Sequence, residues 1–283
     1  MGFISELEDV LPDSGNKNAY LRIALTSISD CEVLKITFNQ PAIRNPLDLK
    51  TADQFSKLCN FCQKWESELP FGAILIEGSG TAFSAGGDFE FLAARSKVPQ
   101  RENIATMSAY YDSFLQVRSL PVVTIANVHA SAIGAGLCLA MACDFVMVHR
   151  EAKLGFPFLK LGINPGMAAY PLLRRRVGET RARDLLFSGR YFSGQDFFDW
   201  GGAWLTYSED EEVYEHLKKW LAKYRDGSYY AFSKLRQEIM MHEDREISSS
   251  LPLEAQGQAG CYAGSDFQER LAKTLQQISN KIK

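Results

Sequence analysis

Cysteine, net charge and long apolar runs are all scarce in this chain. Six cysteines among 283 residues are too few for a disulfide scaffold and favour a reducing, cytoplasmic setting. A net charge of −3 provides no broad basic surface for nucleic acid. The longest apolar region, residues 122–148, is interrupted by Asn127, His129 and Asp144, whereas a membrane span needs about 20 residues with few or no charges. We therefore expect no nucleic-acid partner and no membrane partner.

Motifs for targeting, metal binding and phosphate binding are missing as well. Residues 1–19 carry acidic side chains where a secretory signal has a basic segment and an apolar run, and we interpret them as an N-terminal extension. Cys59 and Cys62 form a single C-x-x-C with no second pair, at positions that a helix would turn toward the core. The run 174–176 (RRR) is interpreted as a solvated face rather than a phosphate clamp. We expect no bound metal.

Strand-like and helix-like segments alternate along the first two thirds of the chain. Two alternating runs within residues 20–38 are typical of strands. Three apolar runs, at 71–80, 121–128 and 144–149, are typical of buried strands. From about residue 178 the pattern becomes helical. The alternation predicts an α/β core with crossover connections, followed by a helical region.

Two segments of small residues each follow a predicted strand and open a predicted helix. They are residues 83–88 (FSAGGD) and 133–137 (IGAGL). A helix N-terminus presents unpaired backbone N–H groups, and glycines there let a ligand oxygen approach them. Neither segment fits a dinucleotide or P-loop pattern. From the residues alone, close packing of helix against strand, a phosphate site and an oxyanion hole made of two amides all stay open.

Five motifs, read in order, resemble the crotonase superfamily, the enoyl-CoA hydratase and isomerase group. They are NQPAIRNPLD, FSAGGDF, PVVTIANVHASAIGAGLCLAMACDF, LGFPFLKLGINPGM and FSGRYFSGQDFFDWGGA. The resemblance implies an α/β fold with a ββα spiral core at 20–205 and a C-terminal helical region at 206–283 that forms trimers or dimers of trimers. It also implies an acyl-CoA thioester as substrate, with coenzyme A as part of the substrate and no other cofactor.

The resemblance places an oxyanion hole at the two small-residue segments. The implied donors are the backbone amides of Ala85 and Ala135, which would hold the thioester carbonyl oxygen as it becomes an enolate. Arg44 matches a segment that lies near the nucleotide end of the substrate in relatives. The residues beside the two donors are expected to line the substrate site: Gly86, Gly87, Asp88, Gly134 and Gly136. For Asp88 a structural role, capping a helix end, is predicted as well.

The positions that carry acids in the family are not acidic in this chain. Family hydratases have two glutamates that hold and deprotonate the attacking water, and these would fall at Cys138 and Phe158. Some isomerases place their base in the Pro-x-Gly turn, where this chain has Gly166. Each missing general acid or base would forfeit about 10²–10⁴ in rate. Conventional hydration is therefore not expected.

Decarboxylation of a malonyl-type thioester would form the enolate by loss of CO₂ and needs no base. Phe158 and Cys138 would suit an apolar pocket, with Tyr170 as its hydroxyl; ordinary packing is the alternative role of Tyr170. Glu90 and Asp112 are further candidate acids.

The C-terminal run ERLAKTLQQISNK matches the family's nucleotide site only in part. Thr274 stands where many relatives have an aromatic residue, Gln277 stands where they have a basic one, and Lys273 is a possible substitute. An acyl group on a carrier protein's phosphopantetheine arm therefore stays an alternative to free acyl-CoA. A catalytically inactive protein that only binds the thioester and an assembly protein that uses only the fold are the remaining hypotheses.

Overall fold

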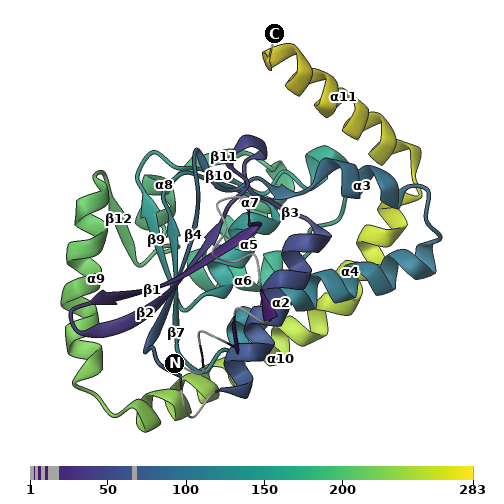
Figure 1. Cartoon of the computed structure of the whole chain (residues 1–283). Coiled ribbons are helices and arrows are strands. Elements are labelled where there is room, and N and C mark those ends of the chain that lie inside the picture. The colour runs from purple at the N-terminus through teal and green to yellow at the C-terminus, as the bar shows by residue number, and fades with distance from the viewer. Residues whose placement is uncertain (1–2, 4–5, 8–9, 12–18, 66–68, 283) are drawn as a thin grey trace.

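In the computed structural model a six-stranded sheet forms the centre of the molecule (Figure 1). All residues are described except 1–2, 4–5, 8–9, 12–18, 66–68 and 283. The strand order is β1-β2-β4-β7-β9-β12; β1 and β2 are antiparallel and every other neighbouring pair is parallel. The strands are β1 (Leu21–Ile28), β2 (Cys31–Phe38), β4 (Ala73–Gly78), β7 (Val123–Val128), β9 (Phe145–His149) and β12 (Leu205–Tyr207).

The apolar runs of the sequence become the central strands of this sheet. All six residues of β7 are buried, as are five of the six residues of β4. Strands with helices over both faces bury both sets of side chains, so they read as continuous apolar runs. In the edge strand β1 only the end residues Leu21 and Ile28 are buried, and the six residues between them are partly or fully exposed. The α/β prediction and the predicted strands are confirmed.

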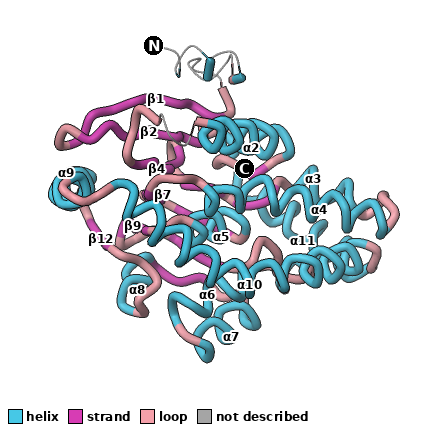
Figure 2. Tube along the Cα trace, turned by 90° about the horizontal axis from the view of Figure 1, so that it is seen from below, coloured by secondary structure: helices cyan, strands magenta, loops and turns pink. Residues whose placement is uncertain are grey.

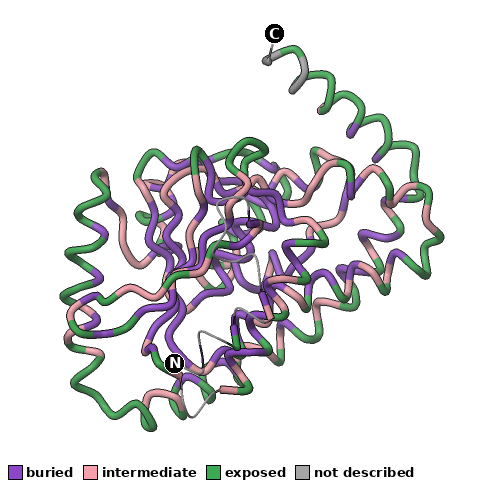
Figure 3. The backbone as a smooth tube through the Cα atoms, viewed as in Figure 1, coloured by how far each residue is buried: buried purple, intermediate pink, exposed green. Residues whose placement is uncertain are grey.

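Helices cover both faces of the sheet (Figure 2). On one face, α9 (Asp210–Arg225) packs Val213, Leu217 and Leu221 against strand residues such as Leu75 and Ile125. The other face is covered by α2 (Leu49–Lys64), α4 (Gln100–Leu115) and α5 (Ala135–Ala142). All eight residues of α5 are buried, and buried residues gather along α5 and the sheet in Figure 3.

Two smaller sheets bring the small-residue segments together. A four-stranded sheet has the order β11-β10-β8-β5, and a two-stranded one pairs β3 with β6. Because β5 and β8 are parallel neighbours, the segments that follow these two strands leave the same edge of the sheet. The strands are β3 (Pro46–Leu47), β5 (Ala82–Ser84), β6 (Gly86–Gly87), β8 (Ser131–Ile133), β10 (Lys153–Gly155) and β11 (Tyr191–Ser193).

The remaining helices follow the sheets along the chain. They are α3 (Phe89–Arg95), α6 (Ala169–Val177), α7 (Glu179–Ser188), α8 (Gly194–Asp199), α10 (Tyr229–Tyr262) and α11 (Ser265–Ile282), with 3-10 turns at Pro41–Ile43, Gln116–Ser119 and Leu159–Leu161. In Figure 1, α11 leaves the body of the molecule toward the C-terminus. None of the described helices combines the length and the apolar character that crossing a bilayer requires.

The predicted boundaries of the core and of the N-terminal extension can be compared with the structure. The core sheet takes in β12, so it ends at Tyr207, two residues beyond the predicted end of the core at 205. Of the N-terminal extension 1–19, the described residues include Phe3, whose ring lies 5.0 Å from that of Phe61 on α2. Most of the rest of the extension lies outside the described residues. The role of 206–283 in trimer formation stays a prediction.

Candidate active site

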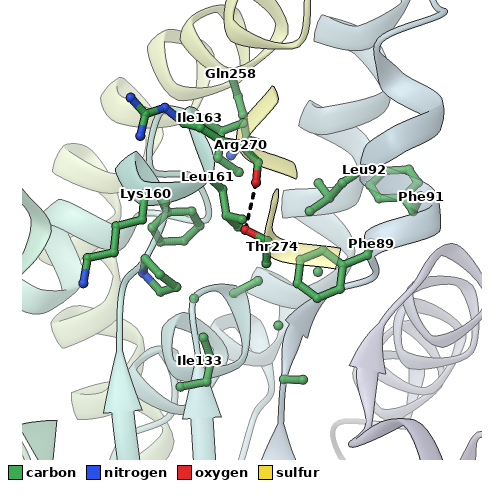
Figure 4. Close-up of a pocket in the computed structure, with 18 of the residues that line it drawn as sticks. Phe89, Phe91, Leu92, Ile133, Lys160, Leu161, Ile163, Gln258, Arg270 and Thr274 are labelled. Carbon is green, nitrogen blue, oxygen red and sulfur yellow. Dashed lines mark hydrogen bonds between the residues drawn. The ribbon is translucent and has the colours of Figure 1, made fainter. Parts of the chain in front are cut away.

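A cavity of about 660 Å³ opens where β6, β8 and the start of α5 meet. Its other walls come from α3, α4, the loop 157–167, α10 and α11. Figure 4 shows the aromatic rings of Phe89 and Phe91 on one side, Ile133 at the base and Gln258 on the opposite side from Ile133. The lining is largely apolar with few polar groups, which is typical of a small-molecule site.

The second small-residue segment presents free helix amides to this cavity. Gly134, the residue after β8, has a left-handed φ of 53°, and its carbonyl oxygen accepts the first helical bond from the Cys138 N–H at 3.0 Å. The amides of Ala135, Gly136 and Leu137 therefore precede the first intrahelical donor. Ala135 lines the cavity, as does Gly134. The Ala135 amide therefore lies at the cavity and has no acceptor within the helix.

Glycines at this point also allow very close packing. A Cβ atom on Gly136 would lie 2.7 Å from Ser84 Cβ, so the first turn of α5 rests directly on β5. A Cβ atom on Gly86 would lie 2.5 Å from the Ile133 carbonyl oxygen and 3.5 Å from the Ala135 nitrogen. Close packing and amide donation are therefore compatible. Gly136 itself packs behind the cavity, while Gly86 and Gly87 line it.

The structure corrects the predicted donor Ala85. Although Ala85 lines the cavity, its N–H donates to the Arg44 carbonyl oxygen at 2.8 Å. Arg44 has a left-handed φ of 62°, which turns its carbonyl toward this strand. The next amide, that of Gly86, donates to Ser84 Oγ at 3.1 Å. The donor that the sequence assigned to Ala85 is already engaged within the fold.

Three predicted substrate contacts lie outside the cavity lining. The Arg44 side chain is exposed, and Arg44 acts here through its carbonyl. Asp88 is the N-cap of α3 and accepts the Phe91 N–H at 2.8 Å, which confirms the structural interpretation of this residue. Tyr170 donates its hydroxyl to the Glu179 carboxylate instead of facing the cavity, so its assignment as the pocket hydroxyl is wrong.

The three positions to which the resemblance assigns acids have different surroundings. Cys138 is fully buried and does not line the cavity, so its predicted place in an apolar pocket lining is wrong. Its thiol lies 3.7 Å from the Gly166 carbonyl oxygen, and burial raises the pKa of that thiol well above its usual range. Phe158 lines the cavity beside Gly134. Gly166 also lines it, but a Cβ atom there would overlap the Tyr111 hydroxyl and lie 2.7 Å from Tyr111 Cζ. No side chain fits at Gly166 without moving Tyr111.

Carboxylates are confined to one edge of the cavity. Among the described residues that line it, the only acids are Asp266 and Glu269, both on α11. Glu90 and Asp112, the other candidate acids, are exposed elsewhere. Nor does any group of three or more His, Cys, Asp or Glu within the described residues have an arrangement suited to a metal ion.

One part of the cavity wall is a buried hydrogen-bond network that no motif of the sequence indicates. Tyr111 donates its hydroxyl to Gln258 Oε1 at 2.7 Å, and Tyr262 donates to the same oxygen at 3.0 Å. Gln258 Nε2 in turn donates to the Asn164 carbonyl oxygen at 2.8 Å. Tyr111 and Gln258 both line the cavity. Helical periodicity marks Tyr111 as a core residue, but nothing in the sequence links α4 to α10.

Next to this network lies a buried carboxyl group. Glu254 on α10 is 8% exposed, and its Oε2 accepts the Ala168 N–H at 2.8 Å. Burial raises the pKa of Glu254 to about 7. The bond holds a strained turn, because Met167 and Ala168 have left-handed φ values of 58° and 55° without being glycines. Met167 lines the cavity, so Glu254 supports the wall from behind.

The α11 edge of the cavity combines both signs of charge. Thr274, Gln277 and Lys273, which the sequence placed at the partly matching nucleotide site, all line the cavity. Figure 4 shows Thr274 beside Arg270, whose carbonyl oxygen accepts the Thr274 hydroxyl at 2.9 Å. The Arg270 side chain is paired with Asp266 at 2.7 Å. This edge is therefore suited to a polar, charged part of a ligand.

Comparison with known proteins points consistently to one family. The family described as "Enoyl-CoA hydratase/isomerase" matches residues 29–278. A "Probable enoyl-CoA hydratase" of Bacillus subtilis is 29% identical over 262 residues, covering 92% of this chain and 98% of that protein. A second, EchA14 of Mycobacterium tuberculosis, is 35% identical over 166 residues, covering 59% of this chain and 62% of that protein.

Solved structures agree on the fold. The crystal structure of an enoyl-CoA hydratase from Bacillus halodurans has a TM-score of 0.78 at 22% identity and covers 90% of this chain and all of that one. An enoyl-CoA hydratase from Mycobacterium smegmatis has a TM-score of 0.77 at 18% identity, covering 91% of this chain and 89% of that one. The ββα architecture expected from the sequence is confirmed.

Proposed function

The chain belongs to the enoyl-CoA hydratase/isomerase family, and from this premise we propose that it binds an acyl thioester in the cavity and stabilises the enolate formed from it. The observation that carries the proposal is the start of α5, where the unpaired Ala135 amide lines a cavity beside the backbone of Gly86 and Gly87. A helix N-terminus carries a partial positive charge that favours a developing oxyanion over a neutral carbonyl.

We propose Gly87 as the second amide donor in place of Ala85. Of the three amides in this segment, those of Ala85 and Gly86 are bonded to Arg44 and Ser84, and Gly87 lines the cavity. A pair of fixed donors binds the enolate more tightly than the thioester, and loss of one such donor costs about 3–4 kcal/mol of barrier.

We further propose that the enolate arises by decarboxylation of a malonyl-type thioester. The C–C bond to the carboxylate breaks, CO₂ leaves, and the electron pair stays on the α-carbon as the enolate. This route suits a site at which the three positions that the resemblance assigns to acids, Cys138, Phe158 and Gly166, supply no base. An apolar surrounding also disfavours the substrate carboxylate relative to neutral CO₂. The same lack of a base supports the alternative of a protein that binds the thioester without turnover.

The proposal also covers the form of the substrate, the location of the protein and its self-association. Coenzyme A enters as part of the substrate and no other cofactor is needed. The mixed α11 edge also admits a carrier protein's phosphopantetheine arm. All six cysteines are free, which suits a cytoplasmic location. Self-association as a trimer or a dimer of trimers is proposed from the family resemblance, and light scattering of the purified protein would measure it.

The proposal is tested by incubating the purified protein separately with crotonyl-CoA and methylmalonyl-CoA and following products by mass spectrometry. We expect CO₂ loss from methylmalonyl-CoA and little hydration of crotonyl-CoA. Hydration at an ordinary enzymatic rate would contradict the inference from the missing acids. Binding of both thioesters by calorimetry without any product would instead favour the inactive binding protein.

Replacing the Ala135 amide tests the oxyanion hole directly. Ala135 is the first residue of α5, a position that tolerates proline, so Ala135→Pro removes one donor with little cost to the helix. We expect turnover to fall by about 10²–10³ at nearly unchanged melting temperature. Asp210→Pro, the same change at the first position of α9 away from the cavity, is the control. Equal activity of the two variants would exclude Ala135 as a donor.

A further inference from the structure

We propose that Tyr111 is the proton donor of this site, delivering its hydroxyl proton to the enolate carbon. The inference rests on the proposed enolate chemistry and names a catalytic residue where Cys138, Phe158 and Gly166 supply no acid. No motif singled out Tyr111, because its place in the cavity depends on the packing of α4 against the loop 157–167 and α10.

The Tyr111 hydroxyl occupies the space of a missing acid. It lies against Gly166, where any Cβ atom would overlap it, and Gly166 is the position at which some relatives have their base. The Gly166 carbonyl oxygen is 3.7 Å from the thiol of Cys138, the other acid position. Cys138 follows Ala135 by three residues on α5, so both lie on the same side of that helix. Gly166 therefore lies between the Tyr111 hydroxyl and the helix that carries the proposed oxyanion donor, and both Tyr111 and Ala135 line the cavity.

The hydrogen-bond network leaves the Tyr111 proton available. Gln258 Oε1 accepts hydrogen bonds from Tyr111 at 2.7 Å and from Tyr262 at 3.0 Å. When Tyr111 turns its proton toward a ligand, Tyr262 still satisfies this buried oxygen, so the rotation does not strand an acceptor. Gln258 is itself fixed by the bond from its Nε2 to the Asn164 carbonyl. Because Tyr262 also donates to Gln258 Oε1, the hydrogen bond from Tyr111 can break without leaving that oxygen unpaired.

The surroundings of Tyr111 keep its hydroxyl protonated, so it can donate a proton but cannot act as a base. It is 1% exposed, and burial, followed by the neighbouring Tyr262 and Glu254, raises the pKa of its hydroxyl well above the usual range. The group is therefore protonated at neutral pH. A thioester enolate is a far stronger base than a tyrosinate, so the transfer runs downhill even from a tyrosine whose pKa is raised.

The step balances without a further reagent. After CO₂ leaves, the Tyr111 O–H bond breaks, a C–H bond forms at the α-carbon, and the saturated thioester and a tyrosinate result. Water entering from the cavity mouth returns the proton to Tyr111, and the hydroxide that it leaves combines with CO₂ as bicarbonate. The net reaction consumes one water and one malonyl-type carboxylate and yields one thioester and one bicarbonate.

Product stereochemistry separates this role from a structural one. Methylmalonyl-CoA turned over in D₂O gives propionyl-CoA with one deuterium at C2, which is a stereocentre. We expect a single enantiomer from the wild type. Tyr111→Phe keeps the ring and loses only the hydroxyl, so we expect a racemic product as solvent replaces Tyr111, together with a turnover number reduced by about 10²-fold. Affinity for propionyl-CoA, measured by calorimetry, should stay within about two-fold of the wild type.

Tyr262→Phe is the matched control, because it removes the other hydroxyl on the same Gln258 oxygen. We expect this variant to retain a single enantiomer. A single enantiomer from Tyr111→Phe as well, or a racemic product from the wild type, would overturn the role of Tyr111 and leave decarboxylation standing. Absence of CO₂ release from the wild type would overturn the decarboxylation itself, and Tyr111 would then have no enolate to protonate.

Discussion

Single residues decide what chemistry this cavity can support. At Gly166 the Tyr111 hydroxyl fills the space into which a side chain would grow, so a carboxylate there would need Tyr111 to move. At Cys138 the small thiol is enclosed, and a charged group would be desolvated in the same place. Phe158 adds apolar surface to the cavity. At Gly166 and Cys138 an acidic side chain is therefore disfavoured by the surrounding packing, in addition to being absent from the sequence.

The buried Glu254 makes the stability of the fold depend on pH. Its pKa of about 7 lies above the usual value of 4.5, so the folded state binds this proton more tightly than the unfolded state. The contribution of Glu254 to stability is then largest below about pH 4.5 and decreases as the pH rises to about 7. Glu254→Gln keeps an oxygen that can accept the Ala168 N–H and removes the charge.

We expect Glu254→Gln and the wild type to have similar free energies of unfolding near pH 4.5. The variant should gain on the wild type as the pH rises, by up to about 3 kcal/mol at pH 8. Urea denaturation at a series of pH values measures this difference, with the pH 4.5 pair as the internal control. Stability curves that run parallel from pH 4.5 to 8 would show that Glu254 titrates alike in both states.

At the level of elements, the site depends on how closely α5 rests on β5. Gly136 makes that approach possible, since a Cβ atom would lie 2.7 Å from Ser84 Cβ and 2.8 Å from the Ser84 carbonyl oxygen. The backbone of β5 cannot yield as a flexible side chain would. Any atom added at Gly136 must therefore push the start of α5, with its Ala135 amide, away from the small sheet.

We expect Gly136→Ala to lower the free energy of unfolding by about 1–3 kcal/mol through overpacking and to lower turnover by displacing the Ala135 amide. Gly260→Ala on α10 is the control, because its Cβ atom would meet only Gln100 Nε2 at an ordinary 3.6 Å. That variant should gain up to about 1 kcal/mol from helix propensity. Chemical denaturation and turnover of both proteins test the pair, and a harmless Gly136→Ala would refute the close contact.

The end of α5 shows a second element-level effect. The run 174–176 was interpreted as a solvated face, but Arg176 is turned inward and donates to the carbonyl oxygens of Met141 and Cys143 at 2.8 and 2.7 Å. These carbonyls lie at the C-terminal end of α5 and have no helical partners of their own. The Arg176 guanidinium thus caps the C-terminal end of α5, while the N-terminal residue Ala135 of the same helix lines the cavity.

At the scale of the whole molecule, α10 contacts both the cavity wall and the start of the central strand β7. Near its start, Arg236 forms a nearly buried ion pair with Asp144 at 2.9 Å and donates to the carbonyl oxygens of Arg118 and Leu120. Asp144 also accepts the Thr124 N–H at 2.7 Å, at the beginning of β7. Near its other end the same helix carries Glu254 and Gln258 to the cavity wall.

We expect Arg236→Met to lower the free energy of unfolding by about 3–5 kcal/mol, because Asp144 is left as a buried charge without its partner. The double variant Arg236→Met/Asp144→Asn should recover part of this loss, since the stranded charge is gone while an amide oxygen still accepts from Thr124. Urea denaturation of the two single variants and the double variant completes the cycle. Strictly additive losses would mean that the ion pair does not couple α10 to the core.

Features that depend on residues close together in the chain could be predicted before the structure was known. Apolar runs predicted the buried strands, Asp88 was expected to cap a helix end and accepts the Phe91 N–H at the start of α3 at 2.8 Å, and residues of both small-residue segments line the cavity. Strand periodicity, helix capping and glycine-rich turns are local, so a few consecutive residues are enough to encode them. Five motifs in order were enough to indicate the family.

Which groups meet in the cavity depends on contacts between distant parts of the chain and could not be predicted. The Ala85 amide is not a free donor, because it is bonded to the carbonyl oxygen of Arg44, which is distant from it in the chain. Tyr170 donates to Glu179 and does not face the cavity. Tyr111 and Gln258 lie 147 positions apart and share a hydrogen bond that no local pattern encodes. Contacts of this kind follow from how the layers pack, because the same side chain serves as core, cap or catalytic group according to what the fold places beside it.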